Sequence, residues 1–230
     1  ELGYRTVRAV AVADEKELIS QGIGEDTAKK LVLESRKTIS LGFITAEELV
    51  KIRGNYKYIT TGVKALDTLL HGGIETQGVT SLYGEHGAGK SQLAQQLTVT
   101  VQLPEERGGL STDNQIAKAM YIDTEQVFRP ERVLSMAECL GFEDPKEVLG
   151  NIVYAEAYTS NHQIELLNSA DHTIEDENIK IIIIDSGTGQ FRSEYIGREM
   201  LAPRQQLLNK HLNKLMRLCR AFDCAGVITN

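Results

Sequence analysis

Residues 84–91 read GEHGAGKS, and they are the strongest indication of the fold because they match the pattern GxxxxGK[ST] without a mismatch. Glycines at these positions let backbone N–H groups turn inward around an anion, and the lysine adds a positive charge for β- and γ-phosphates. An apolar run over 79–83 precedes the stretch and a helical pattern over 92–101 follows it, which is the strand–loop–helix context that the motif requires. The residues expected to bind a nucleotide here are Gly84, Glu85, His86, Gly87, Ala88, Gly89, Lys90, Ser91 and Gln92.

Outside this loop, the apolar and charged content is that of a folded globular protein. Of the 230 residues, 41% are hydrophobic and 25% are charged, which is enough apolar material for a core. No apolar run approaches the ~20 residues needed to span a bilayer, and the N-terminal residues lack the apolar segment of a signal peptide. The 3 cysteines, Cys139, Cys219 and Cys224, show no metal-binding spacing. They favour reduced, cytoplasmic-type thiols over disulfides or zinc.

The net charge of −7 argues weakly against a nucleic acid partner when it is taken for the chain as a whole. The charge is uneven, however. Residues 140–179 carry 1 basic and 9 acidic residues, whereas residues 180–220 carry 8 basic and 3 acidic ones. The global value therefore averages an acidic stretch with an adjacent basic stretch and is a poor guide to partners.

Apolar patterns predict strands and helices in alternation along residues 56–230. Strands are expected over 79–83, 119–123, 152–155, 180–185 and 226–229, and helices over 92–101, 130–140, 162–174 and 201–222. The run IIII at 181–184 is too apolar for a half-exposed strand, so it predicts a central parallel strand. The expected fold class is α/β, a mostly parallel sheet covered by helices on both faces.

Residues 1–40 read as short helices. Asp14 is expected to cap a helix that continues through Ile19, and Asp26 to open a second helix over 27–40. Gly22 and Gly24 lie between them and fit a helix-hairpin-helix, whose glycines let backbone amides approach a DNA phosphate; a plain helix–turn–helix connector explains the pattern equally well. Ala28, Leu31, Val32 and Ser35 are expected to lie on one face of the second helix.

Two acidic motifs end predicted strands. The stretch IIIIDS at 181–186 places Asp185 where it would hold Mg²⁺, usually through water, with the Ser91 hydroxyl as a second ligand; the alternative is an Asp that only ends a strand. The stretch YIDTE at 121–125 places Glu125 where it would polarise a water molecule; an exposed loop acid is an equal alternative. Asp123 is interpreted as structural.

Basic residues follow the predicted strand that ends at Asp185, in the stretch FRSEYIGREMLAPRQQLLNKHLNKLMRLCR at 191–220. Arginines early in this stretch are candidates for a phosphate backbone, with a solvent-exposed loop as an equal alternative. The lysines and arginines of the helix that follows, including Lys210 and Lys214, are interpreted as a solvated face.

Taken together and in order, these stretches resemble the archaeal RadA and eukaryotic recombinase branch of the RecA family. The resemblance covers nearly the whole chain. It implies a DNA-dependent ATPase that uses ATP and Mg²⁺, forms helical filaments on single-stranded DNA, and promotes strand exchange with double-stranded DNA in homologous recombination and DNA repair. It also implies a nucleoid-associated cytoplasmic location, or a nuclear one in a eukaryote. The stretches are those at 72–104, 121–133, 160–163, 181–186, 191–198 and 201–218.

The resemblance also implies roles for single residues. Lys90 and Glu125 take the catalytic positions, the latter as the water-activating glutamate, and Asp185 is the acidic metal residue. Arg132 matches the arginine that stacks on adenine. The candidates for DNA contact are Arg192, Tyr195 and Arg198, and Phe43 and Ala46 in the stretch FITA match the motif through which protomers polymerise.

The resemblance divides the chain into a partial helix-hairpin-helix domain (1–40), a linker with the polymerisation motif (41–55) and an ATPase core (56–230). It places the start of the chain inside the first domain and its end before a γ-phosphate-sensing glutamine and a second DNA-binding loop. This chain departs from the family pattern at His86, which is expected to be a loop side chain. It also has Gly187 and Gly189 where bulkier residues are usual, and these are expected to loosen the turn after Asp185.

Two other functions compete with this interpretation. A regulatory recombinase paralogue would bind ATP and DNA without exchanging strands, and Glu125 and the FITA stretch argue against it because both serve turnover and polymerisation. A hexameric helicase or clock-type ATPase would share the core fold. The N-terminal hairpin and the stretch FRSEYIGR argue against that class.

Overall fold

The computed structural model of the chain describes residues 7–38 and 43–230. Its centre is a sheet of 5 parallel strands in the order β3-β7-β6-β4-β5. The central strand β6 holds the isoleucine run and is buried along nearly its whole length, which confirms the sequence prediction. The strands are β3 (Val79–Leu82), β4 (Lys118–Asp123), β5 (Ile152–Glu156), β6 (Ile179–Asp185) and β7 (Ala225–Thr229).

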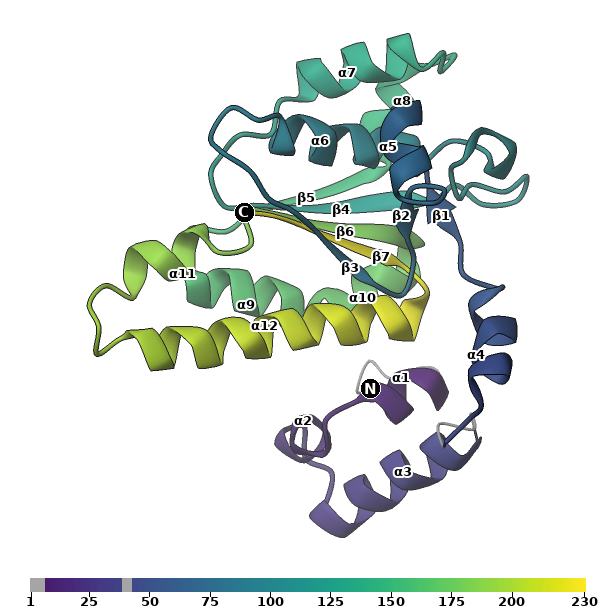
Figure 1. Cartoon of the computed structure of the whole chain (residues 1–230). Helices are drawn as coiled ribbons and strands as arrows, with labels where there is room; N and C mark the ends of the chain where they lie inside the picture. The colour runs from purple at the N-terminus through teal and green to yellow at the C-terminus, as the bar shows by residue number, and fades with distance from the viewer. Residues whose placement is uncertain (1–6, 39–42) are drawn as a thin grey trace.

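Helices cover both faces of this sheet, so the α/β architecture expected from the sequence is confirmed (Figure 1). None of the helices within the described residues is long and apolar enough to cross a membrane. One face carries α6 (Lys90–Thr100), α7 (Pro130–Cys139) and α8 (Pro145–Gly150). The opposite face carries α9 (Ser160–Asn168), α10 (Ala170–Asp176) and α12 (Leu201–Phe222).

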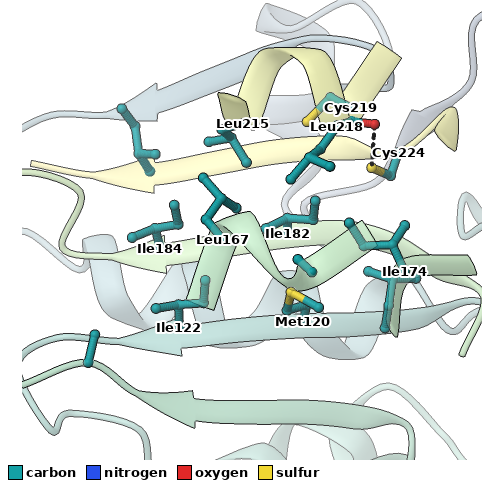
Figure 2. Close-up of a cluster of buried hydrophobic side chains, with 14 residues drawn as sticks. Met120, Ile122, Leu167, Ile174, Ile182, Ile184, Leu215, Leu218, Cys219 and Cys224 are labelled. Atoms are coloured by element: carbon teal, nitrogen blue, oxygen red, sulfur yellow. Dashed lines mark hydrogen bonds between the residues drawn. The ribbon is translucent and has the colours of Figure 1, made fainter. Parts of the chain in front are cut away.

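Successive side chains of each strand point to opposite faces of the sheet. Both faces are apolar, so the protein has one core on each side of the sheet. On the face shown in Figure 2, Ile182 and Ile184 point toward α12 and pack with Leu215 and Leu218. On the other face, Ile181 and Ile183 pack against α6. A strand with isoleucine on both sides can only lie in the middle of such a three-layer arrangement, because an edge or a half-exposed position would leave one face in water.

One small antiparallel pair was not expected from the sequence. It consists of β1 (Tyr58–Ile59) and β2 (Ile74–Glu75), separated by α5 (Lys64–Leu69). Asp67 ties this segment together, because its carboxylate accepts from the Thr61 amide at 2.8 Å and from the Thr60 and Thr61 hydroxyls. The segment covers the α6 face of the sheet through Ile59 and Ile74.

The N-terminal region is helical, with α1 (Val7–Val12), α2 (Glu15–Ser20) and α3 (Glu25–Thr38). Asp14 caps α2 as expected, accepting from the Lys16 amide at 3.0 Å. The prediction that Asp26 opens α3 is wrong by two residues, since α3 begins at Glu25 and the Ala28 amide already donates to the Gly24 carbonyl. The predicted helix end at 40 and the linker residues 41 and 42 lie outside the described residues.

The core of this region is small. Ala28 and Val32 are buried with Ala13 and Leu18, whereas Leu31, expected on the same helix face, is 44% exposed. Only a narrow stripe of α3 faces the other two helices, and a side chain at i+3 from Ala28 falls outside that stripe. Helix α1 lies against α12 in the structure.

Two further expectations need correction. The helix expected over 162–174 is two helices, α9 and α10, which meet at Ser169. Lys214, expected on a solvated face, is 6% exposed and lies 3.2 Å from Asp171 of α10. Lys214 faces α10 because α12 packs against both the sheet and its neighbouring helices. The buried part of the α12 surface is therefore wider than the stripe of leucines indicates.

The linker segment contains a short helix, α4 (Ala46–Arg53). Thr45 caps it in a capping box with Glu48, whose carboxylate accepts from the Thr45 amide at 2.8 Å. No residue of α4 is buried. Its local capping therefore fixes the helix without help from packing within this chain.

Candidate functional site

The loop at 84–91 lies at the carboxyl end of β3, where the chain turns into α6. Gly87 and Gly89 have φ angles of +82° and +91°, the left-handed region that favours glycine. Gly84 comes so close to Ala88 that a Cβ at Gly84 would lie 3.3 Å from the Ala88 Cβ. These glycines therefore leave room for a loop whose N–H groups face an anion, as the sequence predicted.

Lys90 is the first residue of α6, and its side chain folds over the loop. Its Nζ donates to the carbonyl oxygens of Gly84 and Glu85, each at 2.9 Å. Ser91 follows and is half-buried at the same opening. The ammonium group thus lies at the centre of the loop, where it can exchange its carbonyl partners for phosphate oxygens.

Asp185 ends β6 at the same edge of the sheet and is held by two hydroxyl groups. The Tyr121 phenol donates to Asp185 Oδ2 at 2.6 Å, and the Thr229 hydroxyl donates to Oδ1. Asp185 is 1% exposed and Tyr121 is fully buried. Burial and the negative charge of Asp185 raise the pKa of the Tyr121 phenol far above its usual range, so it stays a donor.

The stretch 123–125 separates a structural acid from an exposed one. Asp123 accepts from the amides of Glu125, Val127 and Phe128 at 3.1, 3.2 and 2.9 Å, which matches its structural interpretation. Glu125 is exposed, and its carboxylate points into the opening above the phosphate loop. Its geometry is that of a group available to a ligand rather than one engaged in holding the loop.

Arg132 lies on α7 beside the start of α6. With the Gln92 amide oriented so that its oxygen faces Arg132, that oxygen accepts from the guanidinium at Nη1 and Nε. Gln92 thereby orients Arg132 at the wall of the opening, so the two residues act together rather than as separate contacts.

These side chains surround one cavity of about 540 Å³, a volume suited to a small-molecule ligand. The expected site residues Glu85 and Ala88 belong to the same loop but do not line it. The cavity is lined by Tyr83, Gly84, His86, Gly87, Gly89, Lys90, Ser91, Gln92, Glu125, Val127, Arg132, Asp185, Ser186, Arg192, Thr229 and Asn230.

The donor set in this cavity fits a Mg²⁺ ion that is bound together with phosphate. Among the described residues, no group of three or more His, Cys, Asp or Glu side chains is placed to hold a metal by itself. Both oxygens of Asp185 already accept hydrogen bonds. A hard cation beside Ser91 and Asp185 would therefore take most of its oxygen ligands from phosphate and water, as Mg²⁺ commonly does.

The candidate DNA residues do not all lie together. Arg192 is on α11 (Gly189–Glu194), a short helix after β6, and lines the cavity described above. Tyr195 and Arg198 follow this helix, the first half-buried and the second exposed. Gly22, with φ +94°, and Gly24 lie in the turn between α2 and α3, away from the cavity. The structure thus places Arg192 nearer to the nucleotide opening than the sequence indicated.

Gly187 and Gly189 do not loosen the turn before α11, contrary to expectation. A Cβ at Gly187 would lie 3.1 Å from the Ile228 Cβ, and one at Gly189 would lie 2.6 Å from the Ser186 hydroxyl and 3.3 Å from a Glu125 carboxylate oxygen. The turn is tight because neighbouring groups occupy the space that larger side chains would need.

Phe43 and Ala46 lie at the exposed linker. The Phe43 ring is fully exposed, and the adjoining α4 buries nothing. An apolar groove of about 110 Å³ opens where the sheet ends at β5, far from Phe43 in sequence. It is lined by Met120, Ile122, Val153, Ala155, Leu166, Ser169, Ala170 and Thr173.

Sequence reasoning missed several residues of the site. Tyr121 and Thr229 hold Asp185. Tyr121 pairs with Ile183 on the neighbouring strand β6, and this register brings the Tyr121 hydroxyl to Asp185, two residues further along β6. Tyr83 is 85% exposed and lines the cavity. An aromatic residue directly before the glycine loop was a usable signal for Tyr83, whereas the roles of the other two depend on strand order.

The comparisons with known proteins agree with this geometry. The family model described as Rad51 matches residues 52–230. The chain is 48% identical over 230 residues to the "DNA repair and recombination protein RadA" of Ignicoccus hospitalis, covering 100% of this chain and 70% of that protein. It is also 48% identical over 232 residues to the protein of the same description from Metallosphaera sedula, again covering 100% and 70%. A match over most of the chain, and identity of this degree over its whole length, show that this protein belongs to the Rad51 family.

Proposed function

We propose that this protein is a DNA-dependent ATPase that assembles on single-stranded DNA and promotes strand exchange with double-stranded DNA in recombinational repair. The observation that carries the proposal is the single cavity in which Lys90, Ser91, Glu125 and Asp185 meet, with Arg192 at its wall. This cavity brings together a phosphate-binding loop, an acidic residue that would bind a metal ion and an acidic residue that would orient water. The segment that carries Arg192 lies beside them. The RadA proteins to which the chain is similar are described as DNA repair and recombination proteins.

The phosphates of ATP would lie along the loop at 84–91. Lys90 would turn from the Gly84 and Glu85 carbonyl oxygens to the β- and γ-phosphates, because a phosphate oxygen carries more negative charge than a carbonyl. Arg132, which hydrogen-bonds to Gln92, would stack on the adenine ring. Together they would fix the nucleotide from both ends.

Hydrolysis would use the two acids at the carboxyl edge. Glu125 is exposed to the cavity and would orient a water molecule for attack on the γ-phosphate. Ser91 and the immobilised Asp185 would hold Mg²⁺, which when bound neutralises charge on the phosphate oxygens. The hydroxyls of Tyr121 and Thr229 keep the Asp185 carboxylate in one orientation.

DNA would bind through the segment after β6. Arg192, Tyr195 and Arg198 lie on or directly after α11, and guanidinium groups pair well with backbone phosphates. The turn at Gly22 and Gly24 adds a second possible contact, through backbone amides. Work on chromosomal DNA implies a nucleoid-associated location, or a nuclear one in a eukaryote.

Self-assembly would use the linker. A fully exposed Phe43 ring is costly in water, and the apolar groove at the β5 edge offers a place for it on a second copy of the chain. Ala46, the first residue of α4, follows Phe43 by three positions and would contact the same neighbour. This assembly implies the division proposed for the chain: a helical domain (1–40), a linker (41–55) and an ATPase core (56–230).

The alternative is a regulatory paralogue that binds ATP and DNA without exchanging strands. Exposed Glu125 and Phe43 support the active recombinase, since a paralogue without turnover or polymerisation needs neither. A strand-exchange assay separates the two functions.

The test of the proposal is Lys90→Ala with Lys146→Ala, an exposed lysine on α8, as the matched control. We expect Lys90→Ala to lose ATP binding and single-stranded-DNA-stimulated hydrolysis, whereas the control keeps both. Unchanged hydrolysis in Lys90→Ala would show that the cavity is not the site of turnover.

A further inference from the structure

Helix α11 is fastened to the body of the protein along one side. Phe191 is fully buried, and its ring centroid lies 5.7 Å from that of His211 on α12. At the other end of the helix, the Glu194 carboxylate accepts from the Ser160 amide at 2.7 Å and from the Ser160 hydroxyl. The helix is therefore not a free loop but a short rigid body with a fixed inner face.

Gln190 provides the contact at the start of this helix. Its side-chain amide Nε2 donates to the Thr124 carbonyl oxygen at 3.0 Å and to the Ala157 carbonyl oxygen at 3.3 Å. These two carbonyls follow the ends of β4 and β5, so one side chain joins α11 to two neighbouring strands. Thr124 is 8% exposed and Ala157 is 3% exposed, which means that water cannot freely replace the amide.

Thr124 is the residue directly before Glu125 and is itself locked to the chain that leads into α11. The Thr124 amide donates to the Asp185 carbonyl at 2.8 Å. The Ser186 amide donates to the Thr124 hydroxyl at 2.8 Å, and that hydroxyl donates to the Ser186 carbonyl at 3.1 Å. A displacement of α11 therefore reaches the backbone of Glu125 through Gln190 and Thr124.

The Glu125 carboxylate also lies close to the start of α11. One of its carboxylate oxygens lies 3.3 Å from the position that a Cβ on Gly189 would occupy. The outer side of the same helix turns Arg192 toward the cavity, and the segment continues to the exposed Arg198. A ligand bound to these arginines would thus act on α11. The same helix lies beside Glu125, the acid that faces the γ-phosphate site.

We propose that Gln190 is a positioning residue that transmits DNA binding at the segment after α11 to Glu125. The inference rests on the proposed function, since it assigns a coupling role within the same ATPase. Gln190 is not among the residues that line the cavity. It sets the position of Thr124, and through it the carboxylate that orients the attacking water, according to where α11 lies.

The experiment compares Gln190→Met with Gln206→Met, an equivalent change on an exposed position of α12. Three quantities are measured for each protein: ATP turnover with and without single-stranded DNA, ATP half-saturation, and the affinity for a fluorescently labelled oligonucleotide. We expect the ratio of DNA-stimulated to DNA-free turnover to fall about tenfold in Gln190→Met, the effect of losing one to two buried hydrogen bonds. Its oligonucleotide binding curve should overlap that of the unchanged protein, and Gln206→Met should keep the full ratio.

Several results would overturn the inference. Gln190→Met with full stimulation would do so, as would an equal fall of stimulated and DNA-free turnover, which marks a merely structural role. Loss of stimulation that follows a matching loss of oligonucleotide affinity would assign Gln190 to DNA binding instead. If the unchanged protein shows no DNA-stimulated turnover, the proposed function fails, whereas stimulation that survives Gln190→Met refutes the coupling role alone.

If Gln190→Met does not fold, as judged by circular dichroism, Gln190→Asn takes its place. This variant keeps the amide on a shorter side chain that cannot reach both carbonyls. A partial loss of the stimulation ratio at unchanged oligonucleotide affinity supports the coupling role, and a full ratio refutes it.

Discussion

Replacing Tyr121 by Phe removes one oxygen atom and tests how Asp185 is held. The ring remains, so its packing in the α6-side core and its contact with Phe128, at 4.9 Å between centroids, are kept. What is lost is the hydrogen bond to Asp185 Oδ2 at 2.6 Å. The Thr229 hydroxyl still donates to the other oxygen. The substitution therefore removes the charge-assisted hydrogen bond while it keeps the packing of the ring.

Its magnitude follows from the burial of both partners. A hydrogen bond to a charged group contributes about 1.5–3 kcal/mol, and a buried acceptor left unpaired adds a desolvation cost. Asp185 lines the cavity, so a water molecule can replace part of the lost interaction. We therefore expect the free energy of unfolding to fall by about 2 kcal/mol.

The assay is urea unfolding followed by circular dichroism, with Tyr158→Phe as the control. The Tyr158 hydroxyl also donates to a carboxylate, that of Glu156 at 2.7 Å, but this side chain is 62% exposed. Its loss should cost under about 1 kcal/mol because water can take its place. A destabilisation of Tyr121→Phe no larger than that of the control would refute the reasoning that Tyr121 restrains a buried carboxylate.

Two other outcomes are expected. Burial lowers the pKa of His211 to about 4, below its value of about 6.5 in an unfolded chain, so the unfolded state takes up the proton first as pH falls. The free energy of unfolding should thus fall by about 3 kcal/mol as the pH is lowered from 6.5 to 4. Unfolding measured across that range should show a much smaller fall in His211→Phe. The same fall should remain in His172→Phe, the control at an exposed histidine. Phe43→Glu should shift the protein to smaller assemblies in light scattering while Leu69→Glu, also at an exposed apolar position, does not; equal assembly of both would exclude Phe43 from the interface.

Much of the fold was predictable because its signals are local. The isoleucine run at 181–184 can only suit a strand that is buried on both faces, and it is the central strand β6. The predicted helix over 201–222 matches α12 at both ends. The break between α9 and α10 was missed because Ser169 carries no strong signal of its own, being neither glycine nor proline. Lys214 was placed in solvent because its partner Asp171 belongs to another helix.

The phosphate loop can be recognised from the sequence alone, since the glycines and Lys90 lie within eight consecutive residues and their chemistry depends only on local backbone geometry. The sequence also indicates that acids end two of the strands, at Asp123 and Asp185. That Tyr121 and Thr229 hold Asp185 follows only from the folded structure.

The same holds for the contact by which Gln190 joins α11 to the residue before Glu125. The physical reason is that a hydrogen bond needs donor and acceptor within about 3 Å. For residues 33 to 66 positions apart, strand order and register set that distance, and these depend on how the whole sheet packs rather than on any local pattern.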